Sequence, residues 1–158
     1  YYDVMTNNKI EEELGIRRVP FQTLLAEADF VTLHVPGGTE TEHLIGRDEM
    51  ARMKPTAFVI NCSRGGVVDE SALAHAVASG VIAGAALDVF EIEPTASDVE
   101  FKDPIRTAPH VYGTHHVGAS TEQAQEAVAD EVVKIVRTYV ETGRVINCVN
   151  PAEPVPSG

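Results

Sequence analysis

Strand-like and helix-like segments alternate along nearly the whole of this chain, and no two strand-like segments are joined by a two-residue hairpin turn. Antiparallel neighbours can be joined by such a turn, whereas parallel strands need a longer crossover, usually a helix. The alternation therefore predicts an α/β domain built on a doubly wound parallel sheet with helices on its faces. At 158 residues, the chain is long enough for one domain with a sizeable core.

Short apolar runs bounded by glycine or proline indicate the strands, and apolar residues three or four positions apart indicate the helices. The expected strands cover residues 1–4, 15–19, 30–35, 57–60, 82–89 and 110–114. The expected helices cover residues 21–28, 47–53, 69–79 and 120–142. Polar residues 6–9 and residues 91–109 are expected to be loops, and residues 147–158 a linker or a return strand.

Two of the expected helices have clear end signals. Asp69 fits an N-cap and Gly80 the end of one helix. Ser120 with Gln123 fits a capping box at the start of the longest helix, and Gly143 fits its end. The apolar residues of that longest helix recur on one face, and they are Val128, Val132, Ile135, Val136, Tyr139 and Val140.

The segment from Val59 to Glu70 carries the first candidate for chemistry. Its apolar start predicts a strand covered on both faces, Gly65-Gly66 allows a tight turn, and Arg64 lies between the two. An arginine at the carboxyl end of a parallel strand lies where open α/β sheets bind ligands, and its forked guanidinium suits a carboxylate or a phosphate. Taken alone, Arg64 could equally well pair with a surface carboxylate.

Asp88, Glu93 and His116 also fall at or just beyond expected strand ends, which converge on one crevice in an open parallel sheet. Together with Arg64, they favour a site in which a histidine acts as acid/base beside an arginine clamp. A carboxylate hydrogen-bonded to the imidazole would raise the pKa of the histidine and fix its tautomer. Taken alone, Glu93 could be a solvated loop residue. His115 and His116 could be a chance pair, and a shared metal is disfavoured because adjacent strand residues point to opposite faces.

Composition excludes several other classes of function. A net charge of −12 argues against nucleic acid and against anionic membrane surfaces. No apolar run approaches the roughly 20 residues of a membrane span, and an opening of Tyr-Tyr-Asp predicts no signal peptide. The two cysteines, Cys62 and Cys148, form neither a metal-ligand spacing nor a disulfide framework, which favours a reducing cytoplasm.

Four stretches with recognisable motifs follow one another in order: Leu24–Pro36, Met53–Asp69, Gly84–Pro94 and Thr114–Thr121. Arg64 and Glu93 lie 29 positions apart, and Glu93 and His116 lie 23 apart. In these motifs and spacings the chain resembles the NAD-binding domain of the D-isomer-specific 2-hydroxyacid dehydrogenases, from Asp3 to about Asn150.

The resemblance implies an oxidoreductase that moves a hydride between NAD and C2 of a D-2-hydroxy acid. His116 would be the acid/base at the C2 oxygen and Glu93 its partner, while Arg64 would hold the substrate carboxylate and polarise that oxygen. Asp3, otherwise an ordinary turn residue, would bind the adenosine ribose and favour NAD over NADP. The other cofactor-cleft residues that the resemblance implies are His34, Val35, Pro36, Thr41, Cys62, Ser63, Arg64, Asp88, His116, Gly118 and Ala119.

Within the family, the double histidine at 115–116 and the segment 147–150 most resemble phosphoglycerate dehydrogenases. The expected substrate is therefore 3-phosphoglycerate, in serine biosynthesis, and the expected assembly is a homodimer. A second function class also fits, an NAD(H)-sensing, corepressor-like interaction protein of the same fold. The net charge of −12 gives that alternative no support.

One family motif is missing from the sequence. The glycine-rich phosphate turn, G-x-G-x-x-G, precedes the ribose-binding acid by about 20 residues in dinucleotide folds, and no such turn occurs here. We therefore expect residues 1–146 to be a partial dinucleotide-binding domain that lacks its first β-α unit. Residues 147–158 are expected to lead toward a substrate domain, so that this chain is part of a longer enzyme and by itself binds NAD weakly.

Overall fold

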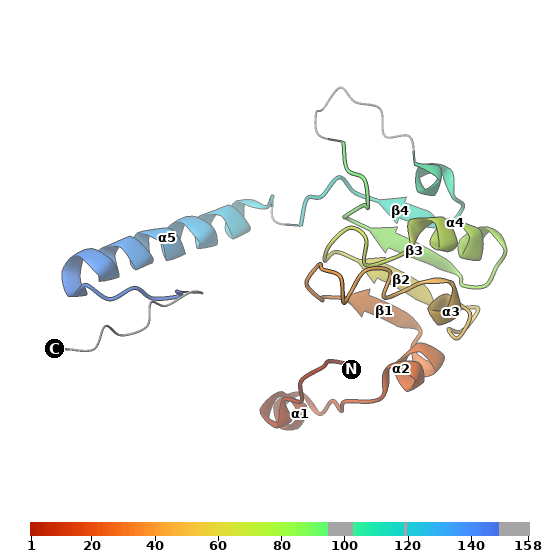
Figure 1. Cartoon of the computed structure of the whole chain (residues 1–158), viewed down its shortest axis with the longest axis horizontal. Helices are drawn as coiled ribbons and strands as arrows, with labels where there is room; N and C mark the ends of the chain where they lie inside the picture. The colour runs from red at the N-terminus through yellow and green to blue at the C-terminus, as the bar shows by residue number, and fades with distance from the viewer. Residues whose placement is uncertain (95–102, 119, 149–158) are drawn as a thin grey trace. The chain divides into compact units, whose positions relative to one another are not determined.

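Four parallel strands form the sheet of the computed structural model, which describes residues 1–94, 103–118 and 120–148 (Figure 1). The strands are β1 (Phe30–Leu33), β2 (Phe58–Asn61), β3 (Gly84–Leu87) and β4 (Val111–Gly113), and they pair in that order. All three pairings are parallel, so the carboxyl ends of the strands lie along one edge of the sheet. The predicted Rossmann-type parallel sheet is confirmed, together with the four strands predicted after residue 29.

The helices are α1 (Asn8–Leu14), α2 (Phe21–Glu27), α3 (Arg47–Met50), α4 (Glu70–Ala78), the 3-10 helix η1 (Pro104–Thr107) and α5 (Glu122–Thr142). Helix η1 lies in the region 91–109 that the sequence predicted to be loop, because Asp103 accepts a hydrogen bond from the N–H of Ile105 at 2.9 Å and starts one turn. The chain divides into two compact units, residues 1–116 and 117–158, and each is described by itself.

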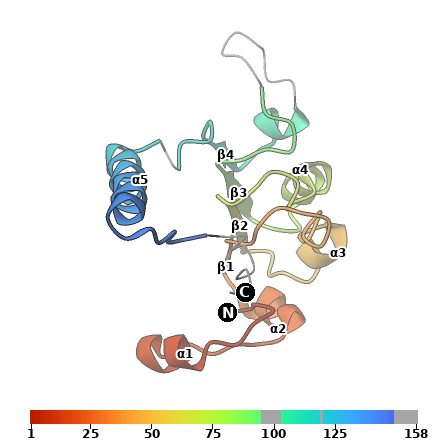
Figure 2. The ribbon, with the colours of Figure 1, turned by 60° about the vertical axis from the view of Figure 1, so that its left-hand side comes forward.

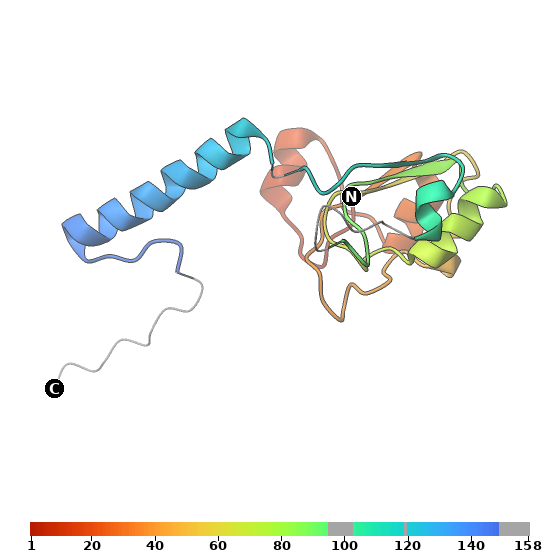
Figure 3. The same cartoon turned by 90° about the horizontal axis from the view of Figure 1, so that it is seen from above.

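One face of the sheet packs against α3 and α4, which lie on the same side of it (Figure 2). Val31, Val59 and Ala85 are adjacent in the strand register and form one apolar cluster with Met50 of α3 and Leu73 of α4. Helix η1 lies beside α4 (Figure 3) and adds a fully buried isoleucine to this cluster. The core of the first unit therefore lies between the sheet and these short helices.

The opposite face of the sheet is only partly covered by residues 1–116. Phe30 of β1 and Tyr112 of β4 are exposed, and Phe58 of β2 is half-buried with its ring stacked on Phe30 at 5.6 Å between centroids. Within residues 1–116, Phe58 and Ile60 of β2 are half-buried, so the predicted cover on both faces is incomplete in this unit. Burial alternates along β2 because every second side chain points away from α3 and α4.

The N-terminal segment contains no β-strand, so the predicted strands at residues 1–4 and 15–19 are wrong. The two stretches still lie side by side. The N-terminal ammonium group of Tyr1 donates to the carbonyl of Arg17 at 2.9 Å, and the N–H of Val19 donates to the carbonyl of Tyr1 at 2.8 Å. Two hydrogen bonds hold the stretches together without extending into a ladder.

Helix α1 occupies residues that the sequence analysis left without a helix. The side chain of Asn7 accepts the N–H of Ile10 at 3.2 Å at its start, and Gly15 ends it at a φ of 63°. Ile10 and Leu14 are its two apolar residues, too few to form an apolar stripe from which to predict a helix. Its only signals were these two caps.

The two predicted helix starts had different outcomes. Asp69 caps α4 as predicted, because its carboxylate accepts the N–H of Ala72 at 2.8 Å. Thr121, rather than the predicted Ser120, caps α5 by accepting the N–H of Ala124 at 3.2 Å. Ser120 and Thr121 both carry a hydroxyl group, and the structure uses that of Thr121, three residues before Ala124.

The second unit consists mainly of α5, which ends as predicted at Gly143 with a φ of 68°. The segment after it folds back, and the side-chain amide of Asn147 donates to the carboxylate of Glu131 at 2.7 Å. The helix buries none of its residues, and Val128, Val132, Val136, Tyr139 and Val140 on its apolar face are exposed. Among the helices of the described residues, none has both the length and the apolar composition that crossing a membrane requires.

Replacing Asp69 tests whether its carboxylate stabilises the start of α4 by capping. Asp69→Ala removes the acceptor for the N–H of Ala72 and is expected to lower the free energy of unfolding by about 0.5 to 2 kcal/mol. Asp69→Asn keeps an acceptor oxygen and is expected to keep most of the wild-type free energy of unfolding. Chemical denaturation of both variants measures the difference, and equal losses would show that the carboxylate acts by something other than capping.

Candidate active site

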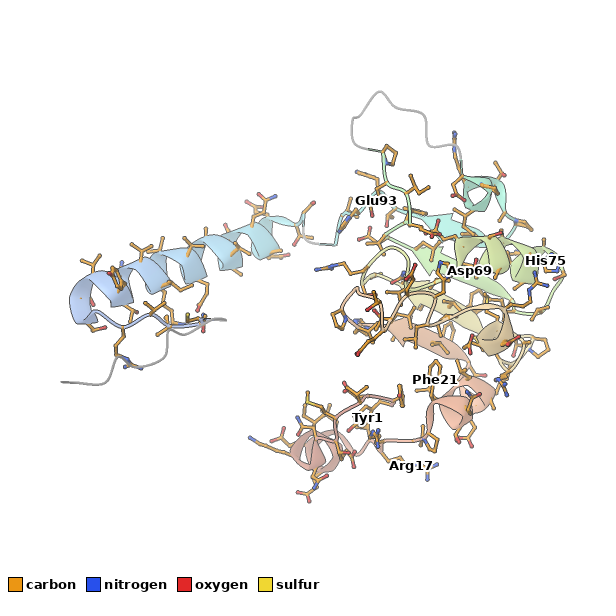
Figure 4. All side chains as sticks on the ribbon, viewed as in Figure 1. Tyr1, Arg17, Phe21, Asp69, His75 and Glu93 are labelled. Atoms are coloured by element: carbon orange, nitrogen blue, oxygen red, sulfur yellow. The ribbon has the colours of Figure 1, made fainter. Side chains whose placement is uncertain are left out.

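Three loops that carry chemistry leave the sheet at the same edge. Arg64 follows β2 by three residues, Glu93 lies in the loop after β3, and His116 follows β4 by three residues. In Figure 4, Glu93 lies near the carboxyl ends of the strands, whereas His75 lies at the far end of α4. Parallel pairing of β2, β3 and β4 therefore places at one edge of the sheet three residues that span 52 positions of sequence.

The turn that carries Arg64 is held from inside by a buried amide. Asn61, the last residue of β2, is 2% exposed, and its Nδ2 donates to the carbonyl of Arg64 at 2.9 Å. Its Oδ1 accepts both the N–H of Ser63 at 3.1 Å and the hydroxyl of Ser63 at 2.8 Å. One amide thus satisfies three groups and fixes the turn on the end of the strand.

The guanidinium of Arg64 is exposed and available to an anionic ligand. It donates to the carbonyl of Ser63 at 2.6 Å, and it pairs with no carboxylate among the described residues. The alternative that Arg64 serves a surface ion pair therefore has no support in this part of the chain.

The arginine turn packs directly on the loop that carries Glu93. A Cβ built on Gly65 would lie 1.9 Å from the carbonyl oxygen of Phe90, a distance that no side chain can occupy. A pocket opens next to this contact, and Gly65 and Glu91 line it together with Gly37 and Thr41 from the loop after β1. The loops after β1, β2 and β3 therefore border one hollow.

Glu93 and His116 form a hydrogen-bonded pair, with Nδ1 of the imidazole 3.0 Å from Oε2 of the carboxylate. The bond from His116 holds the pKa of Glu93 below its usual range, and the N–H of Phe90, 3.2 Å from Oε1, acts in the same direction. An ionised carboxylate only accepts hydrogen bonds, so the proton of the imidazole lies on Nδ1. This leaves Nε2 free to take or give a proton elsewhere.

The backbone of His116 adopts a conformation that is uncommon outside glycine. Its φ is 57°, in the left-handed region, which costs a side-chain-bearing residue about 1 to 2 kcal/mol. Strained conformations of this kind persist only where the surrounding structure determines them, and they cluster at functional sites. The pair with Glu93 is one such determinant, because it fixes the imidazole.

Most of the predicted cofactor residues lie on the same loops; Asp3, Gly118 and Ala119 do not. Val35, Pro36 and Thr41 follow β1, and the hydroxyl of Thr41 donates to the carbonyl of Pro36 at 2.7 Å. Cys62 and Ser63 precede Arg64 on its turn. Gly118 belongs to the second unit, whose placement relative to the sheet is not defined, and Ala119 lies outside the described residues.

His34, Asp88 and Asp3 complete the predicted cofactor set. His34 follows β1 and lies 3.0 Å from the hydroxyl of Thr32. Asp88 follows β3, is 6% exposed, and accepts the hydroxyl of Thr114 from the end of β4 at 2.5 Å. Asp3 is exposed, and one of its carboxylate oxygens accepts the N–H of Met5 at 2.8 Å. A carboxylate in this setting fits the hydroxyl donors of a ribose.

The structure adds a residue that sequence reasoning missed. Glu70, the first residue of α4, is 4% exposed, and its Oε1 accepts the N–H of Glu91 at 2.5 Å. Its Oε2 is buried without a partner among the described residues. Burial raises the pKa of Glu70 to about 7, although the N–H of Glu91 acts in the opposite direction. In sequence, Glu70 looked like an ordinary acidic residue in the first turn of a helix.

Comparison with known proteins agrees with this architecture. The model of the D-isomer specific 2-hydroxyacid dehydrogenase NAD-binding domain matches residues 1–118. D-3-phosphoglycerate dehydrogenase of Methanocaldococcus jannaschii is 44% identical over 86% of this chain and 26% of its own length. Glyoxylate reductase of Thermococcus litoralis is 43% identical over 95% of this chain and 44% of its own length.

A solved structure matches as well. The NAD-complexed D-isomer specific 2-hydroxyacid dehydrogenase of Lactobacillus delbrueckii ssp. bulgaricus superposes with a TM-score of 0.83 at 34% identity, over 94% of this chain and 48% of that one. The chain therefore belongs to the D-isomer-specific 2-hydroxyacid dehydrogenases and corresponds to their NAD-binding domain. It spans between about a quarter and about half of the length of these relatives.

The raised pKa of Glu70 predicts how stability depends on pH. The folded state keeps the proton up to about pH 7, whereas the unfolded chain releases it near 4.5. The stability that this proton contributes is therefore lost as pH rises from about 4.5 to about 7. Glu70→Gln cannot titrate, so its free energy of unfolding relative to wild type is expected to be higher at pH 8 than at pH 4 by about 1 to 3 kcal/mol.

Denaturation curves of wild type and Glu70→Gln at several pH values measure this difference. Glu12→Gln, an exposed carboxylate on α1, serves as the control and is expected to change nothing. A constant difference between wild type and Glu70→Gln across pH 4 to 8 would contradict the raised pKa.

Proposed function

We propose that the protein carrying this chain is an NAD-dependent dehydrogenase that interconverts a D-2-hydroxy acid and its 2-oxo acid, with 3-phosphoglycerate as its substrate. The observation that carries the proposal is the Glu93–His116 pair, which joins the loops of two neighbouring strands at 3.0 Å. An exposed arginine without an ion pair among the described residues stands on the next strand end. Membership of the family supports the class of reaction.

His116 serves as the acid/base of the reaction. When the 2-hydroxy acid is oxidised, the proton of its C2 hydroxyl goes to Nε2, since Nδ1 already carries the proton that is bonded to Glu93. The ionised Glu93 then faces an imidazolium and stabilises it. In the reverse direction, Nε2 returns its proton to the C2 oxygen of the 2-oxo acid.

Arg64 serves as the clamp for the substrate. Its planar guanidinium can form two parallel hydrogen bonds with the substrate carboxylate, a geometry that a lysine cannot reproduce. Asn61 holds the backbone of its turn from within the sheet, and the carbonyl of Ser63 accepts from the guanidinium at 2.6 Å, which helps to preorganise the charge before substrate arrives.

When bound, NAD would accept the hydride from C2 of the substrate, and in the reverse direction its reduced form would supply it. Asp3 would accept the hydroxyls of the adenosine ribose, and a carboxylate there disfavours the 2′-phosphate of NADP. The loop after β1, with Pro36 and Thr41, would line one side of the cofactor, and Cys62 and Ser63 the nicotinamide half. We further propose that Gly118 and Ala119 border the same site.

The choice of 3-phosphoglycerate rests on the double histidine at 115–116 and on the segment 147–150, and it would place the enzyme in serine biosynthesis. The relatives differ in this respect, because they include glyoxylate reductases as well as phosphoglycerate dehydrogenases. A cytoplasmic homodimer, with residues 1–146 in a partial cofactor domain and 147–158 leading toward a substrate domain, completes the proposal.

Replacing His116 tests its role. His116→Asn is expected to lower kcat by about 100-fold or more, since it removes the acid/base group while asparagine still tolerates a positive φ. His110→Asn is the matched control, because His110 has the same φ of 57° but lies before β4. The control should keep nearly full activity. Equal losses in both variants would assign the effect to the backbone, and unchanged rates would overturn the role of His116.

NADH oxidation with a panel of 2-oxo acids tests the substrate. The complete protein is expected to reduce phosphohydroxypyruvate with a kcat/KM at least about tenfold above those for glyoxylate, hydroxypyruvate and pyruvate. Each tenfold ratio corresponds to about 1.4 kcal/mol of difference in transition-state binding. A preference for glyoxylate would favour a glyoxylate reductase over a phosphoglycerate dehydrogenase. Inactivity with every acid would refute the proposed dehydrogenase function.

A further inference from the structure

The loop between β3 and Pro94 places Glu93 beside His116, and contacts along its length hold it. At its start, the N–H of Asp88 donates to the carbonyl of Asn61 at 2.9 Å. In its middle, Phe90 packs on Gly65. The N–H of Phe90 donates to Oε1 of Glu93 at 3.2 Å, and the N–H of Glu91 donates to Oε1 of Glu70 at 2.5 Å. This last bond anchors the backbone only two residues before Glu93.

Glu70 is well suited to hold a loop in place. It lies at the first position of α4, where the preceding cap and the apolar core fix the backbone: Asp69 caps the helix, and Leu73 in the same helix is fully buried. Its carboxyl group is enclosed, so water competes little for the N–H of Glu91. A hydrogen bond shielded in this way is stronger and more directional than one in solvent.

The other groups around Glu70 do not replace this contact. The side chain of Glu91 reaches His43, with 3.3 Å between Oε1 and Nε2, but both groups are largely exposed. Glu91, Glu93 and Asp103 are the charged groups that act on Glu70, and all three are acidic. Among the described residues no cation is seen to act on the carboxyl group, and the N–H of Glu91 is the donor that it meets.

Burying this group has a free-energy cost. Oε2 meets no donor among the described residues, and an unsatisfied buried oxygen costs free energy. A glutamine or an apolar residue at the start of α4 would fold without an ionisable group in the core. The presence of a buried, partly unsatisfied carboxyl group at this position is therefore better explained by its hydrogen bond to the loop than by packing in the core.

We propose that Glu70 is a positioning residue for the Glu93–His116 pair, because its buried carboxyl group fixes the backbone N–H of Glu91 and thereby sets where Glu93 meets the imidazole. Glu70 does not touch the substrate. It acts through the loop, and its effect on turnover rests on the dehydrogenase function proposed above, whereas its effect on Glu93 does not.

The pKa of Glu93 reports this positioning directly. It is held below its usual range chiefly by the hydrogen bond from His116, so it should rise toward 4.5 when the loop is released. Glu70 still carries its proton in the pH range where Glu93 titrates, because the pKa of Glu70 is about 7. In the pH range where Glu93 titrates, replacing Glu70 therefore removes no charge near Glu93 and changes only the position of Glu93.

The experiment is a carboxyl ¹³C NMR titration of Glu93 in the complete protein without substrate. Glu70→Ala is expected to raise the pKa of Glu93 to its ordinary value and to remove the Nδ1–H tautomer signal of His116. Glu70→Gln keeps an acceptor oxygen at the same reach and is expected to leave both readouts as in wild type. A Glu93 titration that is unchanged in Glu70→Ala overturns the proposal.

Two further variants complete the design. Glu49→Ala is the matched control, because Glu49 also accepts a backbone N–H at a helix start, that of Gly46 at 3.1 Å, but on α3 away from this loop. It should not alter Glu93. If Glu70→Ala fails to fold, Glu70→Asp withdraws the acceptor by one methylene and is expected to shift the Glu93 titration in the same direction. No shift in a folded Glu70→Asp variant would also overturn the proposal.

Kinetics separates this proposal from the proposed function. Glu70→Ala is expected to lower kcat by roughly 10- to 100-fold, as for a misplaced catalytic group, with the KM for NADH unchanged and with rescue by Glu70→Gln. Inactivity of the wild type with every 2-oxo acid would refute the dehydrogenase, while the titration would still decide the role of Glu70. An active Glu70→Ala with a wild-type kcat would overturn the positioning role alone.

Discussion

Parallel pairing of β2, β3 and β4 is the constraint on which the site depends. Because all three strands run the same way, the chain must leave each of them at the same edge before it crosses back. The ladder of the sheet brings the loops that carry Arg64, Glu93 and His116 to one edge. Contacts such as the Glu93–His116 bond then set where the side chains lie. The apolar core under the sheet keeps that ladder in register.

The residues that hold the site in place are polar and lie at the carboxyl edge of this core. Asn61, Glu70 and Asp88 are each at most 6% exposed, and each has a hydrogen bond that fixes a turn or joins two strand ends. Elsewhere the core is built of aliphatic side chains. The molecule thus concentrates its costly buried polar groups where loop geometry must be definite, and packs apolar residues where only volume matters.

Sequence reasoning found what depends on local pattern and missed what depends on packing. The four strands and the parallel sheet were predicted from apolar runs bounded by glycine or proline. Glu93 and His116 lie together, as their motifs suggested. Helix α1 was missed because it has caps but no apolar stripe, and the cap of α5 was misplaced by one residue. Glu70 could not be found at all, because only the fold shows that a carboxyl group at a helix start is enclosed and faces the loop after β3.

The contact between Gly65 and the carbonyl of Phe90 limits how the protein can change over evolutionary time. Two loops that are separate in sequence share a boundary with no room for a single methyl group. A substitution at Gly65, or an insertion that thickens either loop, would have to be matched by a change in the other. The arginine turn and the glutamate loop are therefore expected to diverge as one unit among descendants of this sequence, even where their individual residues differ.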